Sequence, residues 1–473
     1  MSSRCPRALG ALVALVSLFT AGYLAPYLLP TVVGRLSAGL GLGPTQAGLV
    51  GSILLLGSAS AGFTFAARAS GARWGHAPWL RRWYPHPCRR LWGSVGPRRA
   101  ARLGLLLMLL GYGTAAATGL VPLVVAGAVV GGFGSGTATA VAAAGIAGRP
   151  DPHRASSLGL LSVSAAAGAL YLTLPHLGSG HALPFAAIAG TALLVAPTTA
   201  WLPDGRAVRL TATARPERGP LPHRVPGTVL AGAILLWSMA QNALWGVSGR
   251  IGLTQAGLSE VTLGLVFAVA LGAGLVGVIG AGVLGSRLGR AVPIGVGTAL
   301  IAACVLLSSA ARGPASFAAG EIAWNAFYPV VLSYLLGLAA SLDPHGRWAV
   351  LVGSASSLGV ACGPVTGSLL SEAAGYPGMG LALCALLLLI AAPMTAVARH
   401  ASGRPLVPGS IHRRGGAPAA VLSATTTPTA LVPQMGAPEQ EITPVPVLVP
   451  GATPAARRRL SRSSFRLAGR ARG

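Results

Sequence analysis

The chain has 473 residues, of which 53% are hydrophobic and only 9% are charged. So few charged residues cannot cover the surface of a water-soluble protein of this length, and the mean hydropathy of +0.66 agrees. The composition therefore excludes a soluble enzyme, a disulfide scaffold and a mainly disordered chain. It predicts an all-α polytopic membrane protein.

Twelve runs of mostly apolar residues approach or exceed the ~20 residues that a helix needs to cross a bilayer. In chain order they are 8–32, 46–68, 103–120, 122–147, 155–175, 182–202, 227–249, 259–285, 292–311, 314–341, 348–371 and 376–398. The polar segment 203–226 divides them six and six. We therefore expect two pseudo-symmetric six-helix bundles, residues 1–202 and 227–398, joined by a central cytoplasmic loop.

Two segments lie outside these spans. Residues 74–101 form a long loop rich in Arg, Trp and Pro, and residues 399–473 form a basic, proline-rich tail that we expect to be disordered. The arginines at 457–472 could contact anionic lipid of the inner leaflet. Nucleic-acid binding is not expected, because no nucleic-acid-binding motif accompanies them.

The arginines predict the orientation. All 35 basic residues are arginine, as in GC-rich actinobacterial genomes, so we expect a bacterial protein. If both termini are cytoplasmic, 32 of the 35 lie on the cytoplasmic side, and only Arg35, Arg250 and Arg312 lie outside. This is the positive-inside distribution of a multi-pass plasma-membrane protein.

A short repeat supports a duplicated six-helix unit. Asp151-Pro152-His153 precedes the fifth span and Asp343-Pro344-His345 precedes the eleventh, which are equivalent positions in the two halves. Such internal repeats are typical of secondary transporters.

The segment between spans eight and nine reads Gly282-Val-Leu-Gly-Ser286-Arg287-Leu-Gly289-Arg290. It resembles the G-x-x-x-D-R-x-G-R pattern of the major facilitator superfamily, with Ser286 in place of the family aspartate. The resemblance covers about residues 8–398. It implies transport by alternating access, with the glycines letting two helices approach and the arginines lying at a gating loop.

Two glycine patterns extend this resemblance. Gly359, Gly363, Pro364 and Gly367 in span eleven are similar to the pattern that antiporter members carry in span five. Span four has a glycine run, Gly131, Gly132, Gly134 and Gly136, but Gly127 or a neighbour stands where antiporter members carry an arginine. We expect small residues at these positions to permit close helix packing.

Glu321 is the only carboxylate inside a predicted span, about 10 Å from the outer face at 1.5 Å per residue. An ionisable group at this depth is a functional candidate by default. Asn325 lies one turn further on the same face, next to Trp324. Water could reach Glu321 from the outer interface.

In the family, spans one, four, seven and ten line a central cavity. The resemblance therefore implies that Gln241 or Asn242, about 22 Å along span seven, faces Glu321 and Asn325. Adjacent helical residues point about 100° apart, so we expect only one of the two amides to do so. Span one adds Tyr23 and Tyr27. The alternative is that these polar groups satisfy one another as contacts between helices.

The resulting hypothesis is a secondary active transporter, with Glu321 as its titratable or cation-binding residue. We expect proton-coupled efflux of a lipophilic neutral or cationic compound by a monomer. A sugar or metabolite importer, a permease with a separate ATPase and a non-transporting receptor or scaffold are the alternatives. No catalytic residues, cofactor or metal are expected, since the spans hold one carboxylate and the cysteines lack metal-site spacing.

Overall fold

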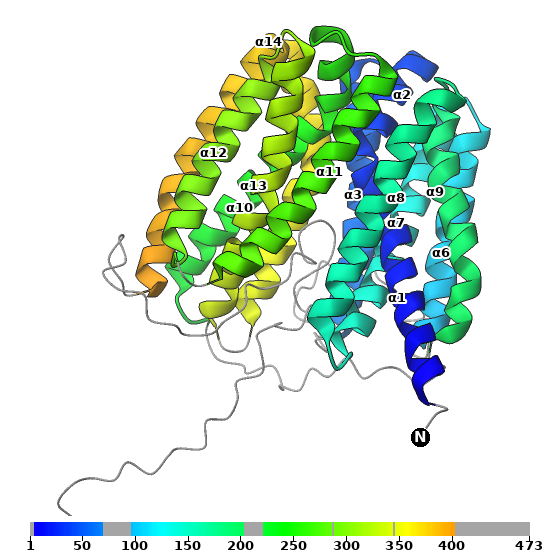
Figure 1. The fold of residues 1–473 in the computed structure, drawn as a ribbon, viewed down its shortest axis with the longest axis horizontal. Coiled ribbons are helices and arrows are strands. Elements are labelled where there is room, and N and C mark those ends of the chain that lie inside the picture. The colour runs from blue at the N-terminus through cyan, green and yellow to red at the C-terminus, as the bar shows by residue number, and fades with distance from the viewer. Residues whose placement is uncertain (1–3, 70–95, 203–220, 286–287, 344–345, 403–473) are drawn as a thin grey trace, which may run out of the picture. The chain divides into compact units, whose positions relative to one another are not determined.

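The computed structural model describes residues 4–69, 96–202, 221–285, 288–343 and 346–402, which belong to one compact unit, Met1–Met435. Within these ranges the chain is helical and contains no strand (Figure 1). The helices are α1 (Arg4–Tyr27), α2 (Leu29–Leu40), α3 (Pro44–Ala69), α6 (Pro97–Ala117), α7 (Val121–Ala147), α8 (Pro152–Leu177), α9 (Ala182–Val195), η2 (Ala196–Trp201), α10 (Arg224–Arg250), η3 (Ile251–Gln255), α11 (Glu260–Leu284), α12 (Ala291–Ser309), α13 (Pro314–Ser341) and α14 (Arg347–Ser402).

Eleven of the described helices are long and apolar enough to cross a membrane. The last of them, α14, is 56 residues long and holds two of the predicted spans. Gly375 breaks it with φ 68° and ψ 173°, in the predicted gap between residues 371 and 376. The expected all-α polytopic fold is confirmed.

The first predicted span ends differently from the expectation. Helix α1 stops at Tyr27, and α2 begins at Leu29 with Pro30 in its first turn, so the apolar run 8–32 is not one continuous helix. A proline inside a helix lacks the N–H and crowds the carbonyl four residues earlier, which explains a break here. The polypeptide then continues in α2 to Leu40.

The helices form two groups, α1–α9 and α10–α14. Contacts are densest within each group, for instance between α6 and α7 and between α10 and α14. The groups meet where α3 packs on α14, α8 on α11 and α2 on α10. We call the side at which α1 begins the near side, and the side of α2 the far side (Figure 1).

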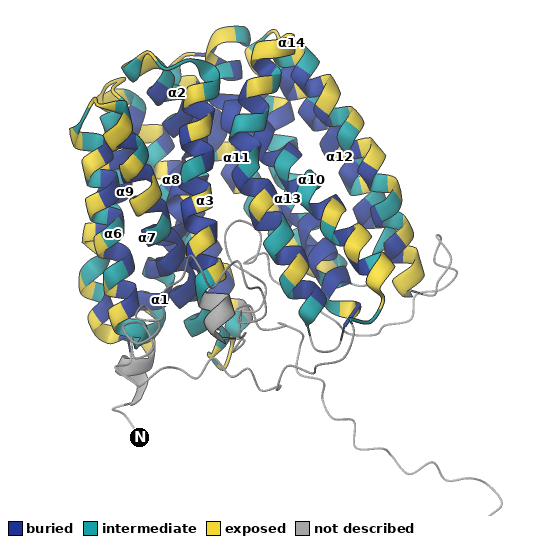
Figure 2. Ribbon diagram, turned by 180° about the vertical axis from the view of Figure 1, so that it is seen from behind, coloured by how far each residue is buried: buried dark blue, intermediate teal, exposed yellow. Residues whose placement is uncertain are grey.

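The burial pattern suits a lipid environment. Buried residues lie where helices face each other, while exposed residues line the outward surfaces of both groups (Figure 2). Large apolar side chains are among the exposed ones, including Leu194 at 78% and Leu389 at 73% exposed. Extensive exposed apolar surface is unfavourable in water and expected against lipid tails.

The glycine run of α7 permits close packing on both sides. A Cβ atom at Gly132 or Gly136 would lie under 3.0 Å from the backbone carbonyl oxygens of Leu54 and Ser58 in α3. Gly134 is equally close to the backbone of α6. Helices approach this closely only where side chains are absent.

The repeated Asp-Pro-His signal marks two helix starts. The Asp151 carboxylate accepts a hydrogen bond from the backbone N–H of Arg154 at 3.0 Å, which caps α8. The Asp343 carboxylate accepts from the backbone N–H and from Nε of Arg347, at 3.1 and 2.8 Å. An acidic side chain here satisfies free N–H groups of the first turn.

Candidate functional site

A cavity of about 110 Å³ lies between the two groups of helices. Helices α1 and α8 line it on one side, and α10, α11 and α13 on the other. The lining residues are Phe19, Tyr23, Pro26, Tyr27, Leu160, Ser164, Asn242, Trp245, Leu271, Gly274, Leu275, Val278, Trp324, Asn325, Tyr328 and Pro329. None of these side chains is an acid, an arginine or a histidine.

Five of the seven predicted binding residues line this cavity. They are Tyr23, Tyr27, Asn242, Trp324 and Asn325. The other two, Gln241 and Glu321, do not line it. As expected for neighbours on a helix, only one of the amide pair in α10 reaches the cavity.

Aromatic rings form much of the wall. The ring centroids of Trp245 and Trp324 are 5.6 Å apart, and those of Trp324 and Tyr328 are 5.8 Å apart. Trp237 stacks on Tyr328 from behind, with centroids 5.1 Å apart and an interplanar angle of 15°. These separations are typical of interacting aromatic pairs and hold the rings in fixed orientations.

The two cavity tryptophans donate their N–H groups to protein acceptors. Trp245 Nε1 donates to the carbonyl oxygen of Pro26 at 3.1 Å, which joins α10 to α1. Trp324 Nε1 donates to Oε1 of Gln241. Gln241 therefore positions an aromatic wall of the cavity from outside it.

The two cavity amides are anchored on their own helices. Asn242 Nδ2 donates to the carbonyl oxygen of Ser238 at 2.9 Å, and Asn325 Nδ2 donates to that of Glu321 at 3.0 Å. A carbonyl acceptor requires the NH₂ end of each amide, which fixes its orientation. Neither amide oxygen has a hydrogen-bond partner among the described residues.

Glu321 lies one turn further toward the far side than Asn325, in a separate buried environment. Its side chain is 0% exposed, so the expectation that water reaches it from the outer interface is wrong for this conformation. Oε1 accepts from Ser248 Oγ of α10 at 2.8 Å. Gln241 Nε2, on the neighbouring helix α10, lacks a hydrogen-bond partner within the described part of the chain.

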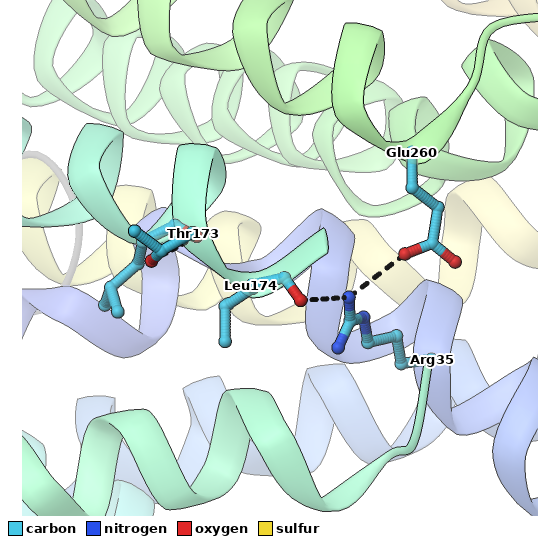
Figure 3. Close-up of polar contacts among 5 residues, drawn as sticks. Arg35, Thr173, Leu174 and Glu260 are labelled. Atoms are coloured by element: carbon cyan, nitrogen blue, oxygen red, sulfur yellow. Dashed lines mark hydrogen bonds and ion pairs between the residues drawn. The ribbon is translucent and has the colours of Figure 1, made fainter. Parts of the chain in front are cut away.

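A buried arginine joins the two groups on the far side (Figure 3). Arg35 Nη2 of α2 lies 3.1 Å from Oε2 of Glu260, the first residue of α11. The same nitrogen donates to the carbonyl oxygen of Leu174 in α8, also at 3.1 Å. The ion pair therefore spans the interface, while the second bond stays within α1–α9.

Two further hydrogen-bond sets cross the interface on the same side. The hydroxyl and backbone N–H of Thr45 donate to the Glu372 carboxylate at 2.5 and 2.9 Å. The backbone N–H of Val365 donates to Ser52 Oγ of α3 at 3.0 Å. Together with the Trp245 bond, these contacts close the far side of the interface. Nothing in the sequence pattern pointed to Thr45 or Glu372.

The span-eleven glycines pack α14 tightly on α10. Cβ atoms at Gly359, Gly363 or Gly367 would lie under 3.0 Å from backbone atoms of α10. Pro364 in turn fits against Gly246 of α10. Close packing at these positions matches the role that the pattern predicted, while a gating role for them stays a prediction.

The motif between spans eight and nine is only partly described. Ser286 and Arg287 lie outside the described residues. Gly282 has open space where a Cβ would lie, so the expected helix approach does not occur there in this conformation. Gly289 has φ 65° and lets the chain turn before Arg290, which precedes the first residue of α12. Glycine tolerates this left-handed conformation at little cost.

Comparisons with known proteins give the fold. No known family profile matches the sequence, and no curated protein does. Solved structures match well: the human organic anion transporter MFSD10 (TM-score 0.56, 18% identity), a D323A mutant of the nucleoside transporter NupG (0.59, 11%) and the transporter FucP in the outward conformation (0.50, 18%). Each alignment covers 82% of this chain and at least 98% of the other.

Proposed function

We propose that this chain, whose fold is that of the major facilitator superfamily, carries a small solute across a membrane by alternating access. The observation that carries the proposal is the cavity, which is lined from both groups of helices. A site between two helical groups changes its access when one group rocks against the other. The residues we assign to the solute are those that sequence and cavity share: Tyr23, Tyr27, Asn242, Trp324 and Asn325.

The interface contacts support a two-state mechanism. The Arg35–Glu260 pair, the Thr45–Glu372 bonds and the Trp245 bond all lie toward the far side. These contacts must break for the far side to open, so this conformation is the far-side-closed member of the cycle. The predicted cytoplasmic N-terminus would make the far side the exterior of a plasma membrane.

The lining favours a lipophilic solute that is neutral or cationic. It contains mostly apolar and aromatic side chains, with two amides and a few hydroxyls. An anionic solute would have no arginine, lysine or histidine to pair with in this lining, and anion sites usually require such groups. Efflux of such a compound is our proposed direction, because an apolar cavity can receive solutes from the inner leaflet.

We propose that transport is coupled to protons through Glu321. A carboxylate buried without a cation is costly when ionised, so its proton occupancy should depend on the state of the transporter. Glu321 contacts Ser248 of α10 and sits one turn from the cavity residue Asn325. Coupling would therefore be indirect, through helix α13 and the Gln241–Trp324 hydrogen bond.

The test uses inside-out membrane vesicles with an imposed pH gradient. The probes are the cationic dye ethidium, the neutral dye Nile red and radiolabelled glucose. We expect gradient-driven uptake of a dye, and loss of its pH dependence in Glu321→Gln at equal protein levels. Glu439→Gln, in the proline-rich tail, serves as the control for removing a carboxylate. Retained pH dependence in Glu321→Gln would refute the coupling role.

The alternatives give different results in the same vesicles. Uptake of glucose but of neither dye would favour the sugar or metabolite importer. Uptake that requires ATP and ignores the pH gradient would favour the permease with a separate ATPase. A receptor or scaffold would move none of the probes under any gradient.

A further inference from the structure

We infer that the cavity recognises an organic ammonium ion through aromatic ring faces and amide oxygens, without a carboxylate. The inference rests on the proposed function, because it takes the cavity to be the solute site. It goes further in choosing the cation over the neutral compound and in naming the groups that hold the charge.

The aromatic wall of the cavity includes the indoles of Trp245 and Trp324. The N–H edges of Trp245 and Trp324 are occupied by Pro26 and Gln241, so neither indole has its donor free for a solute. The feature of these indoles that can still recognise a charged solute is the π face, which carries negative electrostatic potential. Cations bind to such faces, and tryptophan is the strongest of the aromatic residues for this purpose.

The amides add acceptors to this wall. Asn242 and Asn325 each use Nδ2 on a carbonyl of their own helix, and both oxygens stay without a protein partner among the described residues. Both residues line the cavity, so each oxygen can accept from a solute N–H or face a positive charge. The lining therefore offers two amide oxygens beside the aromatic rings, together with hydroxyl groups that can both donate and accept.

This lining suits the classes of solute to different degrees. A sugar would bury many hydroxyl groups against a lining that is mostly apolar and aromatic, and a neutral lipophile would leave the two amide oxygens without a partner. A carboxylate or phosphate would face π faces and amide oxygens, which repel it. An ammonium ion fits both features. Glu321 cannot supply the counter-charge in this conformation, because it lies outside the lining.

The cavity of about 110 Å³ sets the size of the group that binds. An engineered protein cavity of 150 Å³ accepts benzene, so this one suits a headgroup of about one small ring or one substituted ammonium. We therefore use tetramethylammonium as the probe and neopentane as its control. The two have the same shape and differ in the positive charge alone.

Binding is measured on the purified full chain in detergent, by the shift of its thermal unfolding temperature with probe concentration. We expect tetramethylammonium to bind at least tenfold more tightly than neopentane. Replacing all tryptophans with 5-fluorotryptophan, which weakens the π face without changing its shape, should lower the affinity for the cation several-fold. The affinity for the uncharged isostere should stay the same.

Single substitutions test which residues give the preference for the cation. Trp324→Leu should lose the tenfold preference and Trp324→Phe should retain part of it, while Asn325→Leu should weaken cation binding several-fold. Trp201→Phe, at an exposed position outside the cavity, is the matched control and should change nothing. Glu321→Gln should keep the at least tenfold preference for the cation over its uncharged isostere at the same pH.

Three outcomes would overturn the inference. Equal binding of the two probes would mean that the positive charge does not contribute to recognition. Loss of cation binding in Glu321→Gln would mean that a carboxylate takes part in it. Binding of neither probe would overturn it as well. The proposed function is judged separately by gradient-driven uptake in vesicles, which a neutral solute would also show.

Discussion

Removing the Glu260 carboxylate should shift the molecule toward the far-side-open state. In Glu260→Gln the ion pair with Arg35 is lost, whereas the Arg35–Leu174 bond remains within α1–α9. Only contacts that cross the interface contribute to the equilibrium between the two states. The variant therefore changes the free-energy difference between the two states without changing the stability of either group of helices.

The free-energy contribution of this ion pair can be estimated from the exposed fractions of its two side chains. Arg35 has a side chain that is 8% exposed, but the Glu260 side chain is 41% exposed and partly solvated. A hydrogen bond to a charged group contributes about 1.5–3 kcal/mol when buried, and an exposed pair contributes about 0.2–1 kcal/mol. We take about 1 kcal/mol for this half-exposed pair, which is about a fivefold change in the ratio of the two states.

The assay is a distance measurement between spin labels on exposed far-side loops, at Ser179 of α1–α9 and Arg312 of α10–α14. The native cysteines are replaced beforehand. Glu260→Gln should raise the population with the longer label distance about fivefold, and Arg35→Gln/Glu260→Gln should give no further increase. Arg154→Gln, an exposed near-side arginine, is the control.

An unchanged distance distribution in Glu260→Gln would refute the reasoning, because it would mean that the ion pair does not hold the far side closed. An equal change in Arg154→Gln would refute it too, since a general loss of charge would then be the cause. Salt offers a further check. The wild type should approach the variant at high ionic strength, where exposed pairs are screened.

Two stability predictions follow from packing and capping, and both are checked by thermal unfolding in detergent. Gly367→Ala should destabilise the protein by about 1–3 kcal/mol, because its Cβ would overlap the backbone of Ala243, a part of α10 that cannot move aside. Gly113→Ala, with open space around it, should be neutral or stabilise by up to about 1 kcal/mol, so equal losses in both would contradict this account. Asp343→Ala should cost about 1–2 kcal/mol by removing two hydrogen bonds to Arg347, and Asp343→Asn should recover part of it.

The spans could be predicted from the sequence because a bilayer imposes one strong constraint, a helix of about 20 apolar residues. The break at Gly375 was foreseen for the same reason, since the apolar run of α14 is too long for one crossing. The break at Leu28 was missed. The stretch around Pro26 and Pro30 is as apolar as its neighbours, and hydropathy does not register how a proline redirects a helix.

The sequence predicts the site residues where their spacing along a helix determines which side chains face the cavity. Tyr23 and Tyr27 are four residues apart and line the cavity together, and the angle between Gln241 and Asn242 admits only one of them. The same spacing wrongly predicts that Glu321 and Asn325, which are also four residues apart, both line the cavity. The cavity ends between them, so they differ in depth, by about 6 Å along the axis, and not in face. Where a cavity ends depends on the tertiary packing of its neighbours.

The fold gives a structural reason for arginines that depart from the charge distribution predicted from the sequence. Arg35, Arg250 and Arg312 are the exceptions to the asymmetric distribution of the arginines. The sequence alone does not show which contact stabilises an arginine at these positions. Two of the three have a partner in the structure. Arg35 pairs with Glu260 across the interface, and the guanidinium of Arg250 lies 5.8 Å from the ring centre of Tyr376.

Membrane insertion favours arginine on the cytoplasmic side. If the far side is the exterior, as proposed, each far-side arginine opposes this preference, and we expect a contact that compensates for it. The Arg35 contact is with the opposite group of helices, so under the proposed alternating access it must form and break in each cycle. Under the same proposal, the contact between Arg250 and Tyr376 persists through the cycle, because both residues lie in one group of helices. Arg250→Gln should therefore leave the label distances unchanged where Glu260→Gln increases them.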